Sequence, residues 1–311
     1  MKILITGGSG FIGSHLLDRL AVDKHKLFNI DILHPAYEQK GRFRQVDIRH
    51  KPSVDDAIAS FKPHAVVHLA AQTCPTYSVE RPEQDLITNG LGFLNVIEAA
   101  KENDVQRFVY ASSAAVYGDM DRAASEKDNA CPDSPLGISK LLGERYAKLY
   151  GCDEFKTLGL RLSNVYGPRA SVNGECCISG YIGKMMIEQP YTIRDENSVF
   201  DFLHIYDLVD AMVAAVTLHD NDLEGSDVVN VGTGQGRSLG DVNRFLRPLW
   251  VEMTGKKPRK PIDAQRPPEQ PFYSVLNTTK AEELLFPWRP TVDLYQGIKD
   301  TLEWTLGGCK K

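Results

Sequence analysis

The sequence of 311 residues lacks a long apolar run, since no stretch approaches the roughly 18–20 residues that span a bilayer. Its first residues, MKILITGGSG, turn glycine-rich too early to form the apolar core of a signal peptide. It also lacks an excess of basic charge, because the formal net charge is −5 at pH 7. We therefore expect a cytoplasmic protein that binds neither a membrane nor a nucleic acid.

Cysteine is sparse and has no metal-binding or redox spacing. The six cysteines, at positions 74, 131, 152, 176, 177 and 309, include no CxxC pair. The adjacent Cys176 and Cys177 allow a strained vicinal disulfide or the binding of a thiophile, but reduced thiols are the expectation in a cytoplasmic chain. The sequence therefore predicts no metal site.

Short apolar, β-branched runs alternate with helical patterns throughout the first half of the chain. The composition, 42% hydrophobic and 25% charged, is that of a globular protein with one large domain or two smaller ones. Strand–helix alternation with continuously apolar strands predicts a parallel sheet covered by helices on both faces. The expected strands cover 2–6, 27–31, 65–70, 107–112 and 156–162, and the expected helices cover 11–21, 53–61, 86–103 and 135–150.

The rhythm changes after Gly167-Pro168, where longer irregular stretches begin. VVNVG (228–232) has the pattern of a strand that returns to one of the sheets. We therefore expect a Rossmann-type nucleotide-binding domain over 1–167, with a returning segment near 203–235. A smaller α/β substrate-binding domain is expected over 168–311, with helices near 179–188, 206–218 and 239–253.

A glycine-rich turn follows the first expected strand. ITGGSGFIG contains G-x-G-x-x-G as Gly8, Gly10 and Gly13, and also GxxGxxG beginning at Gly7. Alone, this pattern is weak, because glycine loops also form ordinary turns. Here it lies between a strand and a helix, where backbone N–H groups and the positive helix end hold a pyrophosphate. The turn and the next two residues, Phe11 and Ile12, are therefore predicted to bind a dinucleotide.

Two carboxylates support this prediction. Asp31 ends the second expected strand, FNID, where a carboxylate accepts hydrogen bonds from the adenosine ribose hydroxyls. A carboxylate there repels a 2′-phosphate, and no arginine directly follows it, so NAD is favoured over NADP. Asp47, in VDIR beyond the third strand, is placed to bind the adenine amine.

In order and spacing, the motifs resemble those of the extended short-chain dehydrogenase/reductase family, the NAD-dependent epimerases and dehydratases of nucleotide sugars. The resemblance covers nearly the whole chain and rests on TGGSGFIG, VDIR, HLAAQ (68–72), SSAAVYG (112–118), Ser139-Lys140, RLSNVYGP (161–168), DFLHIYDLVDA (201–211) and VNVGTG (229–234). It implies hydride transfer between NAD and a nucleotide-diphosphate sugar. It also assigns cofactor contacts to Ile48, Leu69, Ala70, Ala71, Gln72, Asn89, Ser112 and Lys140, whereas His68 is expected to pack within its strand.

The family's acid/base residue is missing. Members carry Tyr-x-x-x-Lys. The pKa of the tyrosine phenol is about 10 in water, and in the family the lysine and the cationic nicotinamide lower it towards neutrality. This chain has Leu136-x-x-x-Lys140, and leucine can neither accept nor donate a proton. The other parts remain: Ser113 matches the residue that binds the reacting hydroxyl, and Lys140 matches the lysine that binds the nicotinamide ribose.

Three explanations of Leu136 stay open. In the first, the enzyme works through another acid/base: Tyr117, Tyr166, Tyr181, Cys131 or a water held by Ser113 and Lys140. In the second, the protein is a catalytically silent NAD- and nucleotide-sugar-binding regulatory or scaffold subunit. In the third, Leu136 is a substitution peculiar to this one sequence.

The remaining motif positions narrow the reaction and the substrate. Dehydratases of the family follow the serine or threonine with an Asp-Glu pair, which is Ala114-Ala115 here, so a 4,6-dehydratase is not expected. The motifs look most like a UDP-glucose 4-epimerase. Asn164 matches a substrate-binding asparagine and Arg266 a phosphate-binding arginine.

One phosphate-binding position departs from the family. Phe200 replaces an arginine that usually precedes the Asp-Phe pair, so it either stacks on a base or, as we expect, packs. Arg194 is a candidate substitute for the missing cation.

Two expected helices carry apolar faces that bear on assembly. They are formed by Leu91, Leu94 and Ile97 in 89–103, and by Leu141, Leu142 and Leu149 in 135–150. In the family two such helices per subunit build a four-helix interface, so the resemblance implies a homodimer. The alternative is that these faces only cover the sheet.

Overall fold

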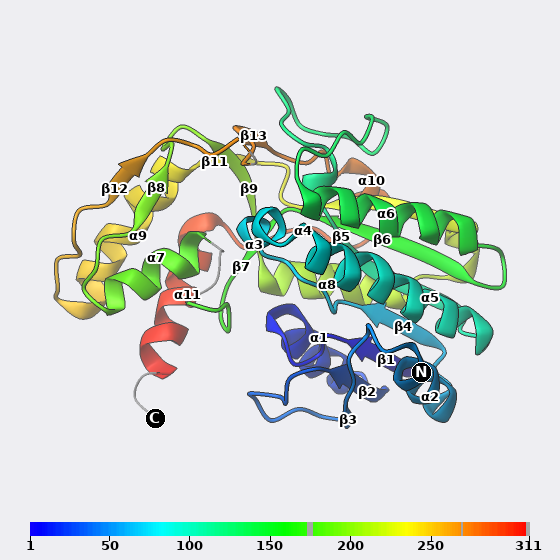
Figure 1. The fold of residues 1–311 in the computed structure, drawn as a ribbon. Coiled ribbons are helices and arrows are strands. Elements are labelled where there is room, and N and C mark those ends of the chain that lie inside the picture. Colours follow the sequence, from blue (N-terminus) through cyan, green and yellow to red (C-terminus); the bar gives the residue numbers. More distant parts are fainter. Residues whose placement is uncertain (173–176, 269, 309–311) are drawn as a thin grey trace.

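A seven-stranded parallel sheet forms the centre of the computed structural model, which describes residues 1–172, 177–268 and 270–308 (Figure 1). Its strand order is β10-β6-β5-β4-β1-β2-β3, as in doubly wound nucleotide-binding folds. The predicted α/β architecture is therefore confirmed. The strands are β1 (Lys2–Thr6), β2 (Lys26–Asp31), β3 (Arg42–Gln45), β4 (Ala65–His68), β5 (Arg107–Ser113), β6 (Lys156–Leu162) and β10 (Ser226–Val231).

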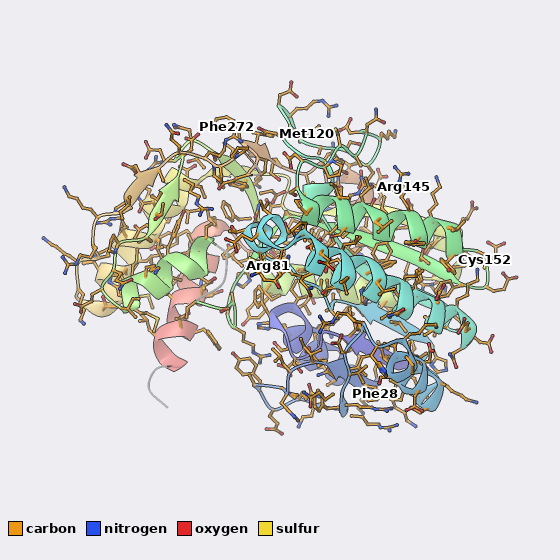
Figure 2. The ribbon with its side chains drawn as sticks, viewed as in Figure 1. Phe28, Arg81, Met120, Arg145, Cys152 and Phe272 are labelled. Carbon is orange, nitrogen blue, oxygen red and sulfur yellow. The ribbon has the colours of Figure 1, made fainter. Side chains whose placement is uncertain are left out.

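Helices cover both faces of this sheet because the side chains of its strands alternate between two apolar cores. Ile3 and Ile5 point to one core, shared with α1 (Phe11–Val22) and α8 (Ile205–Thr217). Leu4 points to the other core, where Phe28 of β2 meets Phe61 at a ring-centroid distance of 5.2 Å (Figure 2). The helices of this second face are α2 (Lys51–Phe61), α5 (Gly92–Glu102) and α6 (Pro135–Tyr150).

A smaller layer lies beside the large sheet (Figure 1) and has a third apolar core. Its four-stranded sheet contains β7 (Asn164–Tyr166), β9 (Val199–His204), β11 (Gly236–Ser238) and β13 (Tyr273–Ser274), and β8 (Thr192–Arg194) pairs with β12 (Ile262–Ala264). The longer helices in the second half of the chain are α7 (Cys177–Met186), α9 (Leu239–Thr254) and α11 (Leu294–Gly308), with the short α10 (Thr279–Leu284). Cys176 and Cys309 lie outside the described residues.

Asp207 ties the two parts of the structure together. It lies on α8, which packs against α1, and its carboxylate accepts hydrogen bonds from Thr291 N, Thr291 Oγ1 and Val292 N, each at 3.0 Å. Because Thr291 and Val292 lead into α11, this carboxylate connects α8, beside the large sheet, to the start of the C-terminal helix, which packs in the third core.

The helix expected over 86–103 is present, but its first part is π-helical and short helices precede it. The chain forms α3 (Pro75–Glu80) and α4 (Pro82–Asp85), then a π-helical turn, η1 (Leu86–Leu91), and only then α5. Gly92, the first residue of α5, allows the helix to lie close to Ile48, because a Cβ at this position would lie 2.6 Å from Ile48 Cδ1.

Two further short helices are η2 (Ala114–Val116) and η3 (Asp220–Asp222). Among the described residues, no helix is both long and apolar enough to cross a bilayer.

Candidate functional site

The glycine turn joins β1 to α1 in a conformation that larger residues would disrupt. Gly7 has φ +74, and a Cβ there would lie 2.6 Å from Ala70 N. A Cβ at Gly13 would lie 2.3 Å from Gly7 O, so the first turn of α1 packs directly on the glycine turn. Gly10 is the N-cap of α1 and offers no side-chain cap, which leaves the first N–H groups of the helix for another acceptor. These features fit a bound pyrophosphate.

Asp31 is oriented beside the glycine turn by two backbone groups. Its Oδ2 accepts a hydrogen bond from Ser9 N and its Oδ1 accepts one from Leu33 N, each at 2.9 Å. A carboxylate has about four acceptor positions in total, so both oxygens can accept further donors. The carboxylate is therefore held in one orientation, as binding of a ribose hydroxyl pair requires.

Asp47 has a partner that the sequence analysis missed. Arg49 donates to both carboxylate oxygens, with Nη2 2.6 Å from Oδ2 and Nε 3.0 Å from Oδ1. The Arg49 side-chain hydrogen bonds are the main cause that lowers the pKa of Asp47. The charge of Asp47 is thus compensated within the protein, while the pair stays partly exposed at the sheet edge.

His68 packs within the sheet. It is buried, its Nδ1 lies 2.9 Å from Thr6 Oγ1, and burial lowers its pKa to about 3. Thr6 Oγ1 also accepts hydrogen bonds from Leu69 N at 3.2 Å and Ala70 N at 3.1 Å. These contacts set the path of the HLAAQ segment as it leaves β4 beside Gly7.

Asn89 forms hydrogen bonds within the protein through its side-chain amide. It is buried, and its amide Nδ2 donates to Gln72 O, Asp85 Oδ1 and Ser139 Oγ at 2.9, 3.0 and 3.2 Å. Its Oδ1 accepts from Gln72 N at 2.8 Å. The side chain of Gln72 is also engaged, donating to Asp85 Oδ1 at 2.9 Å. Both side chains thus connect α4 and α6 to the segment after β4, and their predicted cofactor contacts stay predictions.

Helix α6 presents Leu136 and Lys140 one turn apart. The helix begins at Pro135, after Ser134 caps it by accepting a hydrogen bond from Gly137 N at 3.2 Å. Leu136 is buried, whereas Lys140 Nζ donates to Ala111 O at 2.9 Å. Burial lowers the pKa of Lys140 to about 8, and the Asp85 carboxylate opposes that shift. The lysine is therefore in place, and the leucine contributes no titrating group beside it.

Ser113 ends β5, directly after Ser112. Its Oγ accepts a hydrogen bond from Ala115 N at 3.1 Å and so caps η2. This bond occupies the hydroxyl as an acceptor and leaves its hydrogen available to donate. Ala114 and Ala115 follow at the positions of the dehydratase acid and base, and neither side chain can transfer a proton.

Tyr117 belongs to a buried polar network. Its hydroxyl donates to Asn230 Oδ1 and accepts from Arg161 Nη1, each at 2.7 Å. Arg161 in turn pairs with Glu144 at 2.7 Å, with both side chains buried, and Ser112 Oγ donates to Glu144 Oε1 at 2.5 Å. Burial raises the pKa of Tyr117 to about 12. The hydroxyls of Tyr117 and Ser112 are thus both engaged within this network, and the predicted cofactor contact of Ser112 stays a prediction.

The other acid/base candidates lie in different surroundings. Tyr166 and Tyr181 are buried in the apolar core of the smaller layer, where Tyr166 packs edge-on against Phe202 and Tyr181 packs against Tyr191. Cys131 is an exposed free thiol in the loop that precedes α6. Of the four candidate side chains, only that of Cys131 is not enclosed in a core or buried network.

The predicted substrate residues are spread over the smaller layer. Phe200 packs against Phe202 with ring centroids 6.2 Å apart, as expected. Arg194 lies exposed on β8, and Asn164 lies exposed at the start of β7. Arg266 lies near Asp119, with Nη1 3.5 Å from Oδ2, and also donates to Gln270 O.

Asp119 is a residue that the sequence analysis missed. Its Oδ1 accepts from Phe272 N at 2.8 Å and from Tyr273 N at 3.1 Å, so one carboxylate organises the segment that carries Arg266. Figure 2 places Phe272 beside Met120, the neighbour of Asp119 in the chain. The one sequence feature that pointed to Asp119 is its position directly after the SSAAVYG motif.

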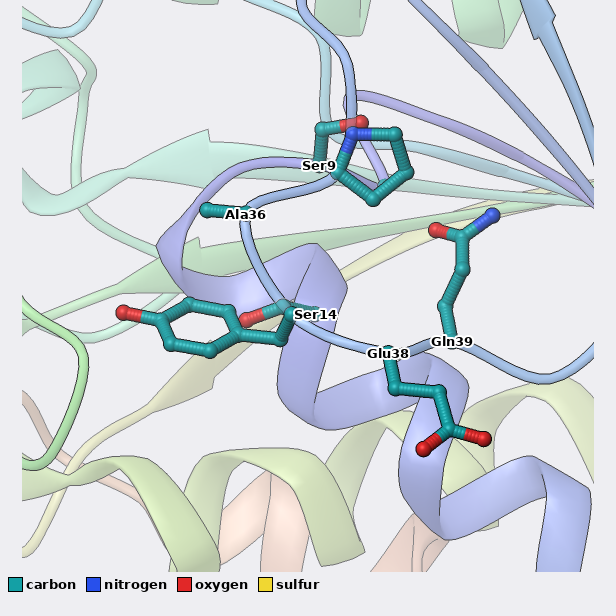
Figure 3. Close-up of a pocket in the computed structure, with 8 residues that line it drawn as sticks. Ser9, Ser14, Ala36, Glu38 and Gln39 are labelled. Carbon is teal, nitrogen blue, oxygen red and sulfur yellow. The ribbon is translucent and has the colours of Figure 1, made fainter. Parts of the chain in front are cut away.

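A pocket beside the glycine turn is lined by one segment that the sequence analysis did not single out (Figure 3). The segment lies between β2 and β3 and follows Asp31 directly. The lining residues are Gly8, Ser9, Ser14, Pro35, Ala36, Tyr37, Glu38 and Gln39. The pocket therefore adjoins the place where the glycine turn and Asp31 fit the pyrophosphate and ribose of a dinucleotide.

Comparisons with known proteins agree with this geometry. The family model described as "NAD dependent epimerase/dehydratase family" matches residues 3–232. A putative UDP-glucose 4-epimerase of Methanocaldococcus jannaschii is 34% identical over 312 residues, with 97% of each chain covered. The UDP-glucose 4-epimerase of Mycolicibacterium smegmatis is 32% identical over 332 residues, with 98% of each covered.

Solved structures resemble the whole chain. The Thermus thermophilus UDP-glucose 4-epimerase in complex with NAD has a TM-score of 0.87 and 32% identity, covering 99% of each chain. The Thermotoga maritima UDP-glucose 4-epimerase with UDP-glucose has a TM-score of 0.89 and 29% identity, covering 99% of this chain and 100% of that one.

Proposed function

This chain belongs to the NAD-dependent epimerase/dehydratase family, and from that premise we propose that it transfers a hydride at a sugar carbon of a nucleotide-diphosphate sugar, with NAD as cofactor. The observation that carries the proposal is the glycine turn, shaped so that only a residue without Cβ fits at Gly7 and Gly13, with the oriented carboxylate of Asp31 beside it. When bound, NAD supplies the hydride acceptor.

Each part of the cofactor would be held by a different element of the chain. The first N–H groups of α1 bind the pyrophosphate, and Asp31 accepts hydrogen bonds from the adenosine ribose. Lys140, anchored to Ala111 O, faces the nicotinamide ribose with its remaining N–H donors. The backbone of Leu69, Ala70 and Ala71 passes beside Gly7 and closes the cleft on the side of β4.

The proton of the reacting hydroxyl is transferred through a water held by Ser113 and Lys140. Leu136 excludes the usual phenol, and Tyr117, Tyr166 and Tyr181 are enclosed in buried networks or cores. The lowered pKa of Lys140, about 8, makes it a stronger hydrogen donor to such a water than an ordinary lysine. A water positioned in this way is a weaker base than a tyrosinate, so we expect slow turnover.

The substrate is a UDP-sugar, and the reaction is epimerisation or simple oxidation and reduction. Several relatives and structural neighbours that match nearly the whole chain are described as UDP-glucose 4-epimerases, which supports the uridine nucleotide. Ala114 and Ala115 argue against elimination of water. Arg266 and Arg194 are the cations on the smaller layer that we assign to the diphosphate.

The protein forms a homodimer through α5 and α6. Ile97 of the predicted apolar faces is fully buried against the sheet, but Leu91 is 48% exposed and Leu149 is 76% exposed. Exposed leucines on adjacent helices favour burial against a second copy. We keep the domain division proposed from the sequence, over 1–167 and 168–311, with a returning segment near 203–235. This proposal is supported by β10, which lies in the large sheet, and by α8, which packs in the core on one face of that sheet.

A catalytically silent NAD- and nucleotide-sugar-binding subunit is the second candidate. The burial of Leu136 favours it, because the position of the missing phenol is occupied by a packed side chain. Anaerobic incubation of the purified protein with UDP-, GDP- and dTDP-sugars, followed by absorbance of NADH, separates the two. Reduced cofactor with any sugar supports the enzyme. Sugar-nucleotide binding with neither reduced cofactor nor an epimerised sugar in the products supports the silent subunit, and no binding of NAD contradicts both.

A further inference from the structure

Segment 32–41, which joins β2 to β3, lies along the pocket beside the glycine turn. Figure 3 shows Ala36, Glu38 and Gln39 of this segment next to Ser9 and Ser14. The buried Asn29 of β2 connects the two sides, because its Nδ2 donates to Gln39 Oε1 at 2.9 Å and to Ser9 Oγ at 3.1 Å. Asn29 therefore connects the C-terminal end of segment 32–41, at Gln39, to Ser9 of the glycine turn.

Tyr37 attaches the middle of the same segment to distant parts of the chain. The guanidinium carbon of Arg169 lies 4.5 Å from the centroid of the Tyr37 ring. Trp304 of α11 packs against the same ring at a centroid distance of 6.1 Å, with the planes at 65°. Tyr37 thus contacts both a cation and an aromatic ring from outside its own segment.

Arg169 is itself held against the helix that follows the glycine turn. Its Nη2 lies 2.7 Å from Asp18 Oδ2 on α1, and its side chain is only 20% exposed. Because Asp18 orients the guanidinium, the ring of Tyr37 meets a positioned cation and not a mobile one. The contact spans segment 32–41, α1, the turn after β7 and α11.

We propose that Tyr37, held by Arg169 and Trp304, latches segment 32–41 over the adenosine end of the cofactor and sets the rate at which the cofactor leaves. This inference rests on the proposed function, since it assumes that the glycine turn binds NAD. For segment 32–41 to move away from the pocket, Tyr37 has to lose its contacts with Arg169 and Trp304. The Asn29–Gln39 hydrogen bond holds only the end of the segment and not its middle.

A latched cofactor also selects the reaction. NAD held by the latched segment would supply a hydride acceptor that is not exchanged between turnovers, so it would have to be restored to its oxidised form by the same sugar. The net change is an isomerisation without net oxidation, so the latch favours epimerisation over dehydrogenation, which needs a new NAD for each turnover.

The test measures cofactor release and not turnover. Wild-type and variant proteins are loaded with NADH and mixed with excess NAD, and the loss of bound-NADH fluorescence gives the release rate. Tyr37→Ala and Arg169→Ala are expected to release NADH about tenfold faster, the effect of losing one stacked cation contact. Tyr37→Phe keeps the ring and is expected to release at the wild-type rate.

Lys40→Ala is the matched control. Lys40 lies on the same segment, and its side chain is 71% exposed, with only Glu38 as an ion-pair partner in the described residues. Equal release rates for Tyr37→Ala and wild type overturn the latch and leave the proposed function intact. A wild-type protein that binds no NAD in calorimetry overturns the proposed function, and the latch with it.

Discussion

Lys140 Nζ donates a hydrogen bond to the carbonyl oxygen of Ala111 at 2.9 Å, which joins helix α6 to strand β5 near its end. Lys140 lies one helical turn after Leu136 in α6. Its acceptor, Ala111, lies two residues before Ser113 in β5. Lys140 is thus fixed against β5, while the residue one helical turn before it, Leu136, is buried and apolar. Five predictions follow from this arrangement and from the surrounding contacts.

Replacing Leu136 by tyrosine is expected to raise the rate of hydride transfer by about 10²–10⁴-fold, the usual contribution of a positioned acid/base group. The phenol would lie one turn from Lys140, whose charge favours the phenolate. The measurement is single-turnover NADH formation with UDP-sugars under anaerobic conditions. Leu136→Phe supplies the same ring without the hydroxyl, and equal rates for the two variants would contradict the prediction.

Lys140 gives the protein a pH-dependent stability. The pKa of Lys140 is lowered from 10.5 to about 8 by burial, so between these values the unfolded chain binds more protons than the folded one. The free energy of unfolding contributed by this group therefore increases as pH rises from about 8 to about 10.5, where the folded lysine is already neutral.

Lys140→Met should consequently stabilise the protein relative to wild type more at pH 7 than at pH 10. Urea unfolding at the two pH values measures the difference. Lys148→Met, at an exposed position of the same helix, is the control and should change stability equally at both. A stabilisation by Lys140→Met that does not depend on pH would show that the buried lysine is not the source.

Breaking the buried pair between Arg161 and Glu144 is expected to destabilise the fold strongly. Both side chains are less than a tenth exposed, so Glu144→Gln leaves an uncompensated guanidinium in the core, at a cost of about 3–5 kcal/mol. The exposed pair of Arg44 and Asp56 is the control, and Asp56→Asn should cost less than about 1 kcal/mol. Chemical denaturation measures both. Similar losses for the two variants would argue that burial of the first pair has no energetic consequence.

Gly13→Ala is expected to abolish NAD binding. Its Cβ would lie 2.3 Å from Gly7 O, so either the glycine turn or α1 has to move. Calorimetry with NAD measures the binding, and far-UV circular dichroism confirms that the variant is folded. Gly307→Ala introduces the same methyl group where no atom lies within 4 Å, and it should bind NAD as wild type does. NAD binding by folded Gly13→Ala at wild-type affinity would remove the glycine turn from the site.

Leu149→Glu is expected to convert the proposed dimer to a monomer. Leu149 is 76% exposed on α6, and a carboxylate there would be buried without a partner at the interface. Sedimentation equilibrium measures the mass. Ile262→Glu changes a residue that is 51% exposed on the smaller layer and should leave the mass unchanged. A wild-type protein that sediments as a monomer would end the dimer proposal directly.

Several parts of this structure could be predicted because they depend on neighbouring residues. The glycine turn, the strands of the large sheet and the packing of His68 and Phe200 follow from local patterns of apolar residues and glycine. Asn89 was predicted to touch the cofactor, yet its amide is occupied by Gln72, Asp85 and Ser139. A polar residue in a motif does not reveal which donors and acceptors the fold will bring to it.

Tyr117 and Tyr37 also show that sequence patterns do not predict long-range contacts. Tyr117 stayed open as an acid/base candidate until the structure placed Arg161 and Asn230 against its hydroxyl. Tyr37 carried no motif at all, and its importance comes from Arg169 and Trp304, which are far away in the chain. Contacts between residues so distant in sequence are set by how the layers pack, which local patterns do not encode.

The amino-acid sequence alone determined the phase of α6, because helical geometry puts residues 136 and 140 on one face wherever that helix lies. It equally determined the backbone of the glycine turn, since only residues without Cβ fit there. Tertiary packing decided which hydroxyls are enclosed, which lysine is buried away from water and which segment lies over the pocket beside the glycine turn. Burial and long-range neighbours control those properties, and both exist only once the sheets and helices have come together.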